Sequence, residues 1–204
     1  MGITIYYKGK LKNKDEVYSL KDDLVDFAET MNWEWHALDN DWDKPASAEL
    51  DVKARRAEIK GHLPLKGVSL QLHPNCETLT LYFDQEGRLM DPIGLIMIRE
   101  GRLKPQSAYL SVKTQFAPPE VHISIIKLLE FLKNRYIPDL EVMDEGGYWE
   151  SRDEAALRKS ISFLNEQMDR MEEILSTIGR EEVKGLSTEE LARLIEQKLK
   201  NWKK

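Results

Sequence analysis

The chain has 204 residues, of which 41% are hydrophobic and 32% are charged, a composition typical of a globular protein with one good core and a well-solvated surface. Proteins that bind nucleic acids or anionic membranes usually have a basic surface, whereas this chain has a formal net charge of -6. We therefore expect neither a nucleic acid nor a membrane as a partner. The single cysteine, Cys76, excludes an intrachain disulfide and a metal site built from several cysteines.

The chain begins MGITIYYKGK, which lacks the long apolar run of a signal peptide. No apolar stretch approaches the length of a membrane span. The sequence therefore predicts a cytoplasmic protein without a membrane partner.

The first elements follow hydrophobic periodicity. Residues 3–10 alternate as a strand does, and Asn13 is a good cap for a helix whose apolar face runs to Met31. Trp33, Trp35 and Ala37 alternate again and predict a second strand. Residues 44–57 fit a loop with one helical turn. Strands are expected over residues 68–72 and 78–83, whereas residues 93–98 fit either a strand or a buried helical turn.

The stretch 108–150 reads as a complete strand–helix–strand unit. Residues 108–114 form the first strand, Pro118 and Pro119 open the helix, and residues 140–143 form the second strand. The same order of elements occurs in residues 7–42, which predicts two related units that share one sheet. If the two strands of the later unit are parallel, the loops that follow them meet at one edge, where open α/β sheets bind ligands.

Polar residues gather in these two loops and in the first turns of the helix between them. A hard divalent metal needs carboxylate oxygens, and His122 is a candidate base, with Lys113 countering substrate charge. The equally simple alternative is structural: Glu120 suits a helix N-terminus, and the loop after Asp144 is an acidic turn. The candidate residues are, for catalysis, His122, Lys113 and Glu120; for ligand binding, Gln115, Asp144, Glu145, Tyr148 and Trp149; and for a metal, Asp144, Glu145 and Glu150.

The character of the chain changes after Glu150. Ser151 with Glu154, and Ser187 with Glu190, match capping boxes that start two helices, and Gly179 is expected to stop the first of them. Apolar residues of the first helix recur at alternating spacings of three and four, which is the a/d seam of a coiled coil. This seam serves either self-association or a protein partner, or it packs on the chain's own domain or on the last helix. Its members are Leu157, Ile161, Leu164, Met168, Met171, Leu175 and Ile178.

These patterns predict an α+β fold: a domain over residues 1–150, with a mixed sheet in which two strand–helix–strand units flank antiparallel strands, and a C-terminal helical hairpin over residues 151–204. No phosphate-binding loop, dinucleotide fingerprint or nucleophile elbow occurs in the sequence. We therefore expect a non-catalytic interaction or regulatory protein without a cofactor. The alternatives are a metal-dependent hydrolase or phosphoryl-transfer enzyme with its site near Asp144, and a small-ligand sensor at the same strand ends.

Overall fold

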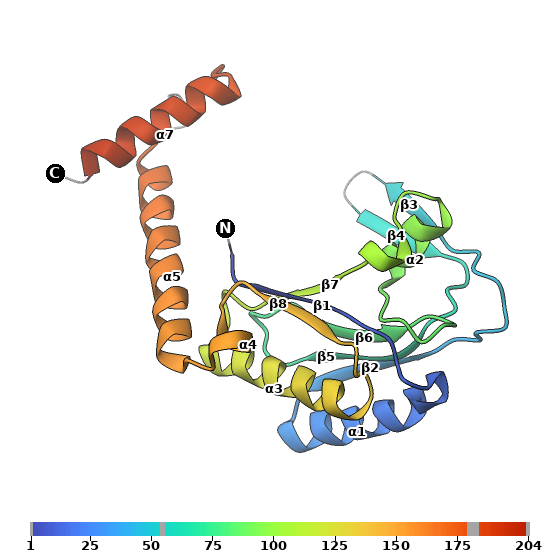
Figure 1. Cartoon of the computed structure of the whole chain (residues 1–204). Coiled ribbons are helices and arrows are strands. Elements are labelled where there is room, and N and C mark those ends of the chain that lie inside the picture. The colour runs from blue at the N-terminus through green and yellow to red at the C-terminus, as the bar shows by residue number, and fades with distance from the viewer. Residues whose placement is uncertain (1, 54–55, 179–183, 203–204) are drawn as a thin grey trace. The chain divides into compact units, whose positions relative to one another are not determined.

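A computed structural model of the chain describes residues 2–53, 56–178 and 184–202 (Figure 1). The chain divides into two compact units, Met1–Arg158 and Lys159–Lys204. The predicted boundary after residue 150 falls shortly before the observed one, because the first turn of a long C-terminal helix belongs to the larger unit.

The larger unit confirms the α+β class, with three antiparallel sheets in place of the single mixed sheet that the sequence suggested. The first sheet has the order β7-β1-β8, the second β2-β5-β6 and the third is the pair β3-β4. The strands are β1 (Thr4–Lys8), β2 (Glu34–Asp39), β3 (Glu49–Lys53), β4 (Arg56–Lys60), β5 (Lys66–Gln71), β6 (Leu79–Phe83), β7 (Leu110–Lys113) and β8 (Glu141–Asp144).

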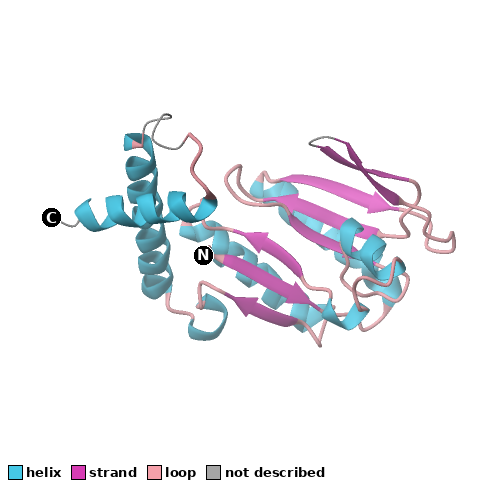
Figure 2. Ribbon diagram, turned by 90° about the horizontal axis from the view of Figure 1, so that it is seen from above, coloured by secondary structure: helices cyan, strands magenta, loops and turns pink. Residues whose placement is uncertain are grey.

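The first two sheets lie edge to edge, with β6 beside β7, and two helices cover one of their faces (Figures 1 and 2). These helices are α1 (Val17–Met31), which follows a short 3-10 turn at Lys14–Glu16, and α3 (Pro119–Arg135). Asn13 caps the 3-10 turn that leads into α1 by accepting a hydrogen bond from Asp15 N, and Pro119 opens α3 as predicted. Their apolar faces and the strands enclose the main core.

A smaller core lies beside the second sheet and involves α2 (Pro92–Arg99). Asp91 caps α2 by accepting a hydrogen bond from Gly94 N, which decides residues 93–98 in favour of a helix. The prediction of a loop over residues 44–57 is wrong, because β3 lies there and pairs with β4. Both strands alternate polar and apolar residues, as ELDVK and RAEIK, so the sequence contains the strand pattern that the loop prediction overlooked.

Strand β1 pairs with both β7 and β8, antiparallel to each. Strands β7 and β8 therefore point in the same direction, which is the condition for their following loops to meet at one edge, and β1 lies between them. The two units predicted to share one sheet are built differently, because β1 and β2 belong to separate sheets. Only the later unit brings its two strand ends to one edge.

The predicted C-terminal helices are present as α5 (Glu154–Thr177) and α7 (Thr188–Trp202), and a short helix, α4 (Tyr148–Ser151), precedes them. The second capping box is confirmed: Ser187 N donates to Glu190 Oε2, and Glu190 N donates to Ser187 Oγ. The first is wrong, because Asp153 caps α5 by accepting from Ala156 N. The predicted stop at Gly179 lies outside the described residues. None of the described helices has the length and apolar character needed to cross a bilayer.

Candidate functional site

The predicted polar residues meet where β7 and β8 end. Thr114 follows β7 directly, Asp144 is the last residue of β8, and His122 lies in the first turn of α3. The imidazole lies between the other two side chains: Thr114 Oγ1 is 2.8 Å from His122 Nδ1, and His122 Nε2 is 3.2 Å from Asp144 Oδ2. We call Thr114, His122 and Asp144 the strand-end cluster.

The strand-end cluster is buried. The side chains of His122 and Asp144 are both 0% exposed, and Thr114 is also fully buried. A carboxylate only accepts hydrogen bonds, so His122 Nε2 carries the hydrogen toward Asp144. Thr114 Oγ1 bonds to Nδ1 and also lies 3.4 Å from the backbone oxygen of Ile3. The cluster thus joins the ends of two strands and a helix through one continuous chain of hydrogen bonds.

The Asp144 carboxylate has further donors from the turn that follows it. Gly146 N lies 2.7 Å from Oδ1 and Trp149 N lies 2.9 Å from Oδ2. Burial raises the pKa of the Asp144 carboxyl, but the hydrogen bond and charge interaction with His122 and these two backbone donors outweigh it, so the net pKa lies below the usual value. Both oxygens are therefore committed to groups of the chain itself.

Gly146 and Leu157 close the strand-end cluster. A Cβ atom at Gly146 would lie 2.8 Å from Leu157 Cδ1 and 3.1 Å from His122 Cε1, so the backbone passes too close for a side chain. Leu157, in the first turn of α5, is fully buried. This member of the predicted seam therefore packs over the strand-end cluster. For Leu157, the alternative that the seam packs on the chain's own domain is the one observed.

The other predicted site residues lie around the strand-end cluster with separate partners. Glu120 pairs with Arg158 at 2.6 Å, Glu145 Oε2 accepts from Thr4 N at 3.0 Å, and Glu150 is exposed. Tyr148 and Trp149 are half-buried and lie near the guanidinium of Arg152. Among the described residues, no group of three His, Cys, Asp or Glu side chains is arranged to hold a metal ion, including the candidates Asp144, Glu145 and Glu150.

The two ring nitrogens of His122 face Thr114 and Asp144, and Lys113 and Gln115 have other surroundings. The backbone N–H of Lys113 donates to Glu77 Oε2 at 2.8 Å, and its ammonium lies 5.1 Å from the ring of Phe116. Gln115 is buried, and its side-chain oxygen has no hydrogen-bond partner. The sequence missed the part that Thr114 plays, because strand alternation alone does not show which of three consecutive polar residues turns toward α3.

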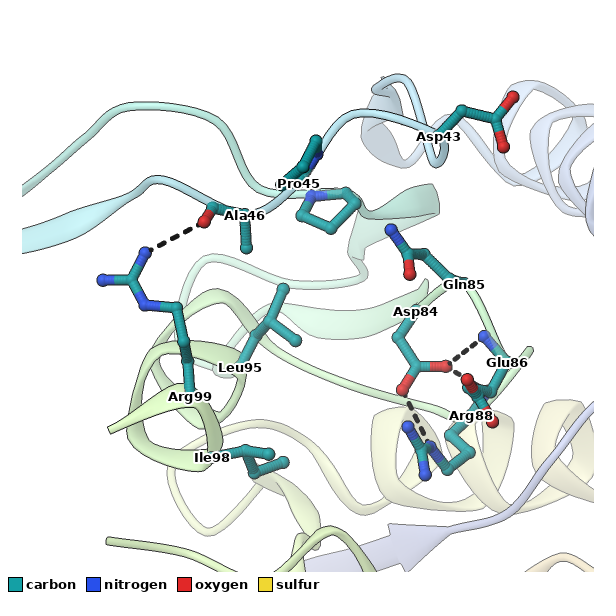
Figure 3. Close-up of a pocket in the computed structure, with 11 residues that line it drawn as sticks. Asp43, Pro45, Ala46, Asp84, Gln85, Glu86, Arg88, Leu95, Ile98 and Arg99 are labelled. Carbon is teal, nitrogen blue, oxygen red and sulfur yellow. Dashed lines mark hydrogen bonds and ion pairs between the residues drawn. The ribbon is translucent and has the colours of Figure 1, made fainter. Parts of the chain in front are cut away.

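A separate groove of about 460 Å³ lies between α2, the turn after β6 and the segment around Pro45 (Figure 3). Leu95 and Ile98 give it an apolar wall. The Asp84 carboxylate on its other side accepts from Glu86 N, Arg88 N and Arg88 Nε at 2.8–2.9 Å, so it is used in shaping the turn. Sequence reasoning did not predict the groove, because the groove depends on where α2 packs.

The predicted seam continues along α5 within the smaller unit. Ile161 is buried, whereas Leu164, Met171 and Ile178 are half-buried and Met168 is 48% exposed. The side chain of Leu175 lies outside the described part of the chain. Apart from Leu157 and Ile161, the described seam members thus keep part of their surface exposed.

Comparison of the chain with protein-family models, with curated proteins and with solved structures finds no significant match.

Proposed function

We propose that this chain is a non-catalytic interaction or regulatory protein of the cytoplasm that associates with another helix through the apolar seam of α5. The partner is a second copy of the chain or another protein, and not a membrane or a nucleic acid. The observation that carries the proposal is the half-exposed Met168 between the half-buried Leu164 and Met171 on one helix face. Burying such side chains against a partner contributes about 25 cal/mol per Å² of apolar area removed from water.

The base of α5 supports this role because it is firmly held. Leu157 is buried over the strand-end cluster, and Arg158 pairs with both Glu120 and Glu154. Asp153 caps the helix. A helix whose base is fixed loses less conformational freedom when a partner binds than a loose segment loses.

The strand-end cluster favours an architectural role over a catalytic one. All three of its side chains are buried, and hydrogen bonds join His122 to the other two. Both carboxylate oxygens of Asp144 also accept a hydrogen bond from a backbone N–H. The alternatives of a metal-dependent hydrolase or phosphoryl-transfer enzyme, and of a small-ligand sensor, stay predictions. Calorimetric titration with magnesium, manganese and zinc tests the first, and thermal shifts across a metabolite panel test the second.

The test of the proposal changes the seam in the full-length chain. The double variant Leu164→Glu/Met171→Glu places charges on the apolar face, while the matched control Glu166→Gln changes a residue on the opposite face of the same helix. We expect the double variant to lose mass in light scattering or to lose capture of a partner protein, and the control to retain both. Unchanged mass together with unchanged capture in the double variant would contradict the proposal.

A further inference from the structure

The predicted seam beyond Leu157, which follows α5 and ends at Ile178 one residue past the helix, reads the same in both directions. Its six positions are isoleucine, leucine, methionine, methionine, leucine and isoleucine, at spacings of three, four, three, four and three: Ile161, Leu164, Met168, Met171, Leu175 and Ile178. Both the residue types and the spacings are palindromic about a point between Asp169 and Arg170. From this symmetry we infer that the partner of α5 is a second copy of this chain, bound antiparallel around a twofold axis at that point. The inference rests on the proposed function and adds the partner and its orientation.

An antiparallel coiled coil places the a position of one helix opposite the d position of the other. Counting heptads from Leu157 as d puts Ile161, Met168 and Leu175 at a, and the remaining three seam residues at d. Antiparallel pairing about the axis then matches isoleucine with isoleucine, leucine with leucine and methionine with methionine in every layer. Parallel in-register pairing also matches each residue with its own copy, so the equal layers permit both orientations, and the residue types at a and d decide between them.

The residue types fit a parallel dimer less well. Parallel two-stranded coils prefer a β-branched residue at a and leucine at d, and leucine at a with isoleucine at d shifts the preference to higher oligomers. Here the last pair is Leu175 at a and Ile178 at d, the reverse of the dimer pattern. No asparagine stands at an a position to impose a parallel register.

The position of the larger unit along the chain also favours the antiparallel arrangement. That unit ends at Arg158, three residues before the first seam layer. A body of 158 residues has a radius of gyration of about 15 Å, whereas paired helices lie only about 8–10 Å apart. Parallel pairing needs two such bodies at the same end of a short seam, while antiparallel pairing puts them at opposite ends.

The positions that flank the seam contain nothing that opposes self-pairing. They are occupied by Ser160, Asn165, Gln167, Glu172 and Ile174, which include one charge. In the antiparallel register Asn165 lies beside Glu172 of the second copy, so an amide meets a carboxylate and no like charges meet. The seventh predicted member, Leu157, does not take part because it is buried over the strand-end cluster.

Disulfide formation in full-length chains tests the orientation, with the buried Cys76 replaced by alanine in every variant. Leu164→Cys and Leu175→Cys share a layer only in the antiparallel dimer, so we expect a mixture of the two chains to form the mixed disulfide. Leu164→Cys alone should not cross-link, because eleven residues of helix separate the two copies of that position by about 16 Å, beyond disulfide reach. Glu166→Cys, on the outer face, is the control and should not cross-link in either orientation.

A second measurement avoids new cysteines. Met168→Lys and Met171→Glu each place a charge at the centre of the seam, so each chain alone should lose dimer mass in analytical ultracentrifugation. Mixed together, the two should regain it, because residue 168 of one chain meets residue 171 of the other only in the antiparallel register. Two results together would overturn the antiparallel orientation: Leu164→Cys cross-links by itself, and mixing the charged chains does not restore the dimer mass. The dimer would then be parallel, and the proposed function would still hold.

The mass of the unaltered chain separates the remaining outcomes. A monomer at all concentrations that still captures a partner through the seam would overturn the self-pairing and keep the proposed function. A monomer that captures nothing would overturn both. A concentration-dependent dimer with the antiparallel cross-link supports both.

Discussion

The strand-end cluster and the α5 seam place polarity in opposite ways. In the first, a hydroxyl, an imidazole and a carboxylate are buried, while in the second a methionine is 48% exposed between half-buried apolar residues. A buried polar group is tolerated only with hydrogen-bond partners, so the cluster contributes to the stability of the larger unit. Exposed apolar groups gain little from folding and much from a partner. Substitutions in the cluster should therefore change stability, and substitutions in the seam should change association.

The largest effect is expected from His122→Ala. The substitution removes a fully buried ring and leaves Thr114 Oγ1 and Asp144 without their partner. Breaking one partner of a buried pair costs about 3–5 kcal/mol of unfolding free energy. Urea denaturation measures the loss, with His36→Ala at the exposed edge of β2 as a control that should change stability by less than about 0.5 kcal/mol. A similar loss in both variants would remove the special role of the cluster.

The next effect concerns the close passage of the backbone. Gly146→Ala inserts a Cβ against Leu157 and His122, and overpacking of this kind costs about 1–3 kcal/mol. Gly147→Ala is the matched comparison: its φ is 70° with nothing within 4 Å of the added carbon, so only the left-handed backbone penalty of about 1 kcal/mol applies. Thermal or urea unfolding gives both values. If Gly146→Ala is the milder of the two, Leu157 is not packed tightly over the cluster.

Acid should weaken the larger unit through Asp144. The pKa of its carboxyl is lower in the folded chain than the value of about 3.9 for an unperturbed aspartate, so its contribution is complete above that value and is lost as the pH falls through the folded pKa. We expect the unfolding free energy of the unaltered chain to fall more steeply from pH 5 to pH 2 than that of Asp144→Asn. Parallel pH profiles of the two chains would contradict this account.

The smallest effect on stability is expected in the seam. Met168→Gln keeps the length of a half-exposed side chain, so the unfolding free energy should change by less than about 0.5 kcal/mol at concentrations where the chain is monomeric. The same variant should weaken association, as sedimentation velocity over a range of concentrations would show. A large loss of stability in the monomer would mean that Met168 packs within its own chain.

The sequence predicted the location of the candidate site better than its arrangement. His122 and Asp144 were both named, and both lie in the strand-end cluster. Roles were assigned to Lys113 and Gln115, whereas Thr114, which lies between them and received none, provides the third side chain. The alternation of a strand assigns faces only when its partner and register are known, and here β7 obtains both from β1, more than a hundred residues away.

Local signals in the sequence determined the parts that depend on neighbouring residues. The cap at Asn13, the proline start of α3, the capping box at Ser187 and the periodicity of α5 all act within one or two helical turns, and the structure has each of these helices where the pattern indicated. Only the tertiary structure decided that β1 separates β7 from β8, that Leu157 leaves the seam to cover His122, and that the polar residues at the strand ends are buried. Those features arise from contacts between residues far apart in the chain, and single-sequence periodicity carries no record of which distant segments meet.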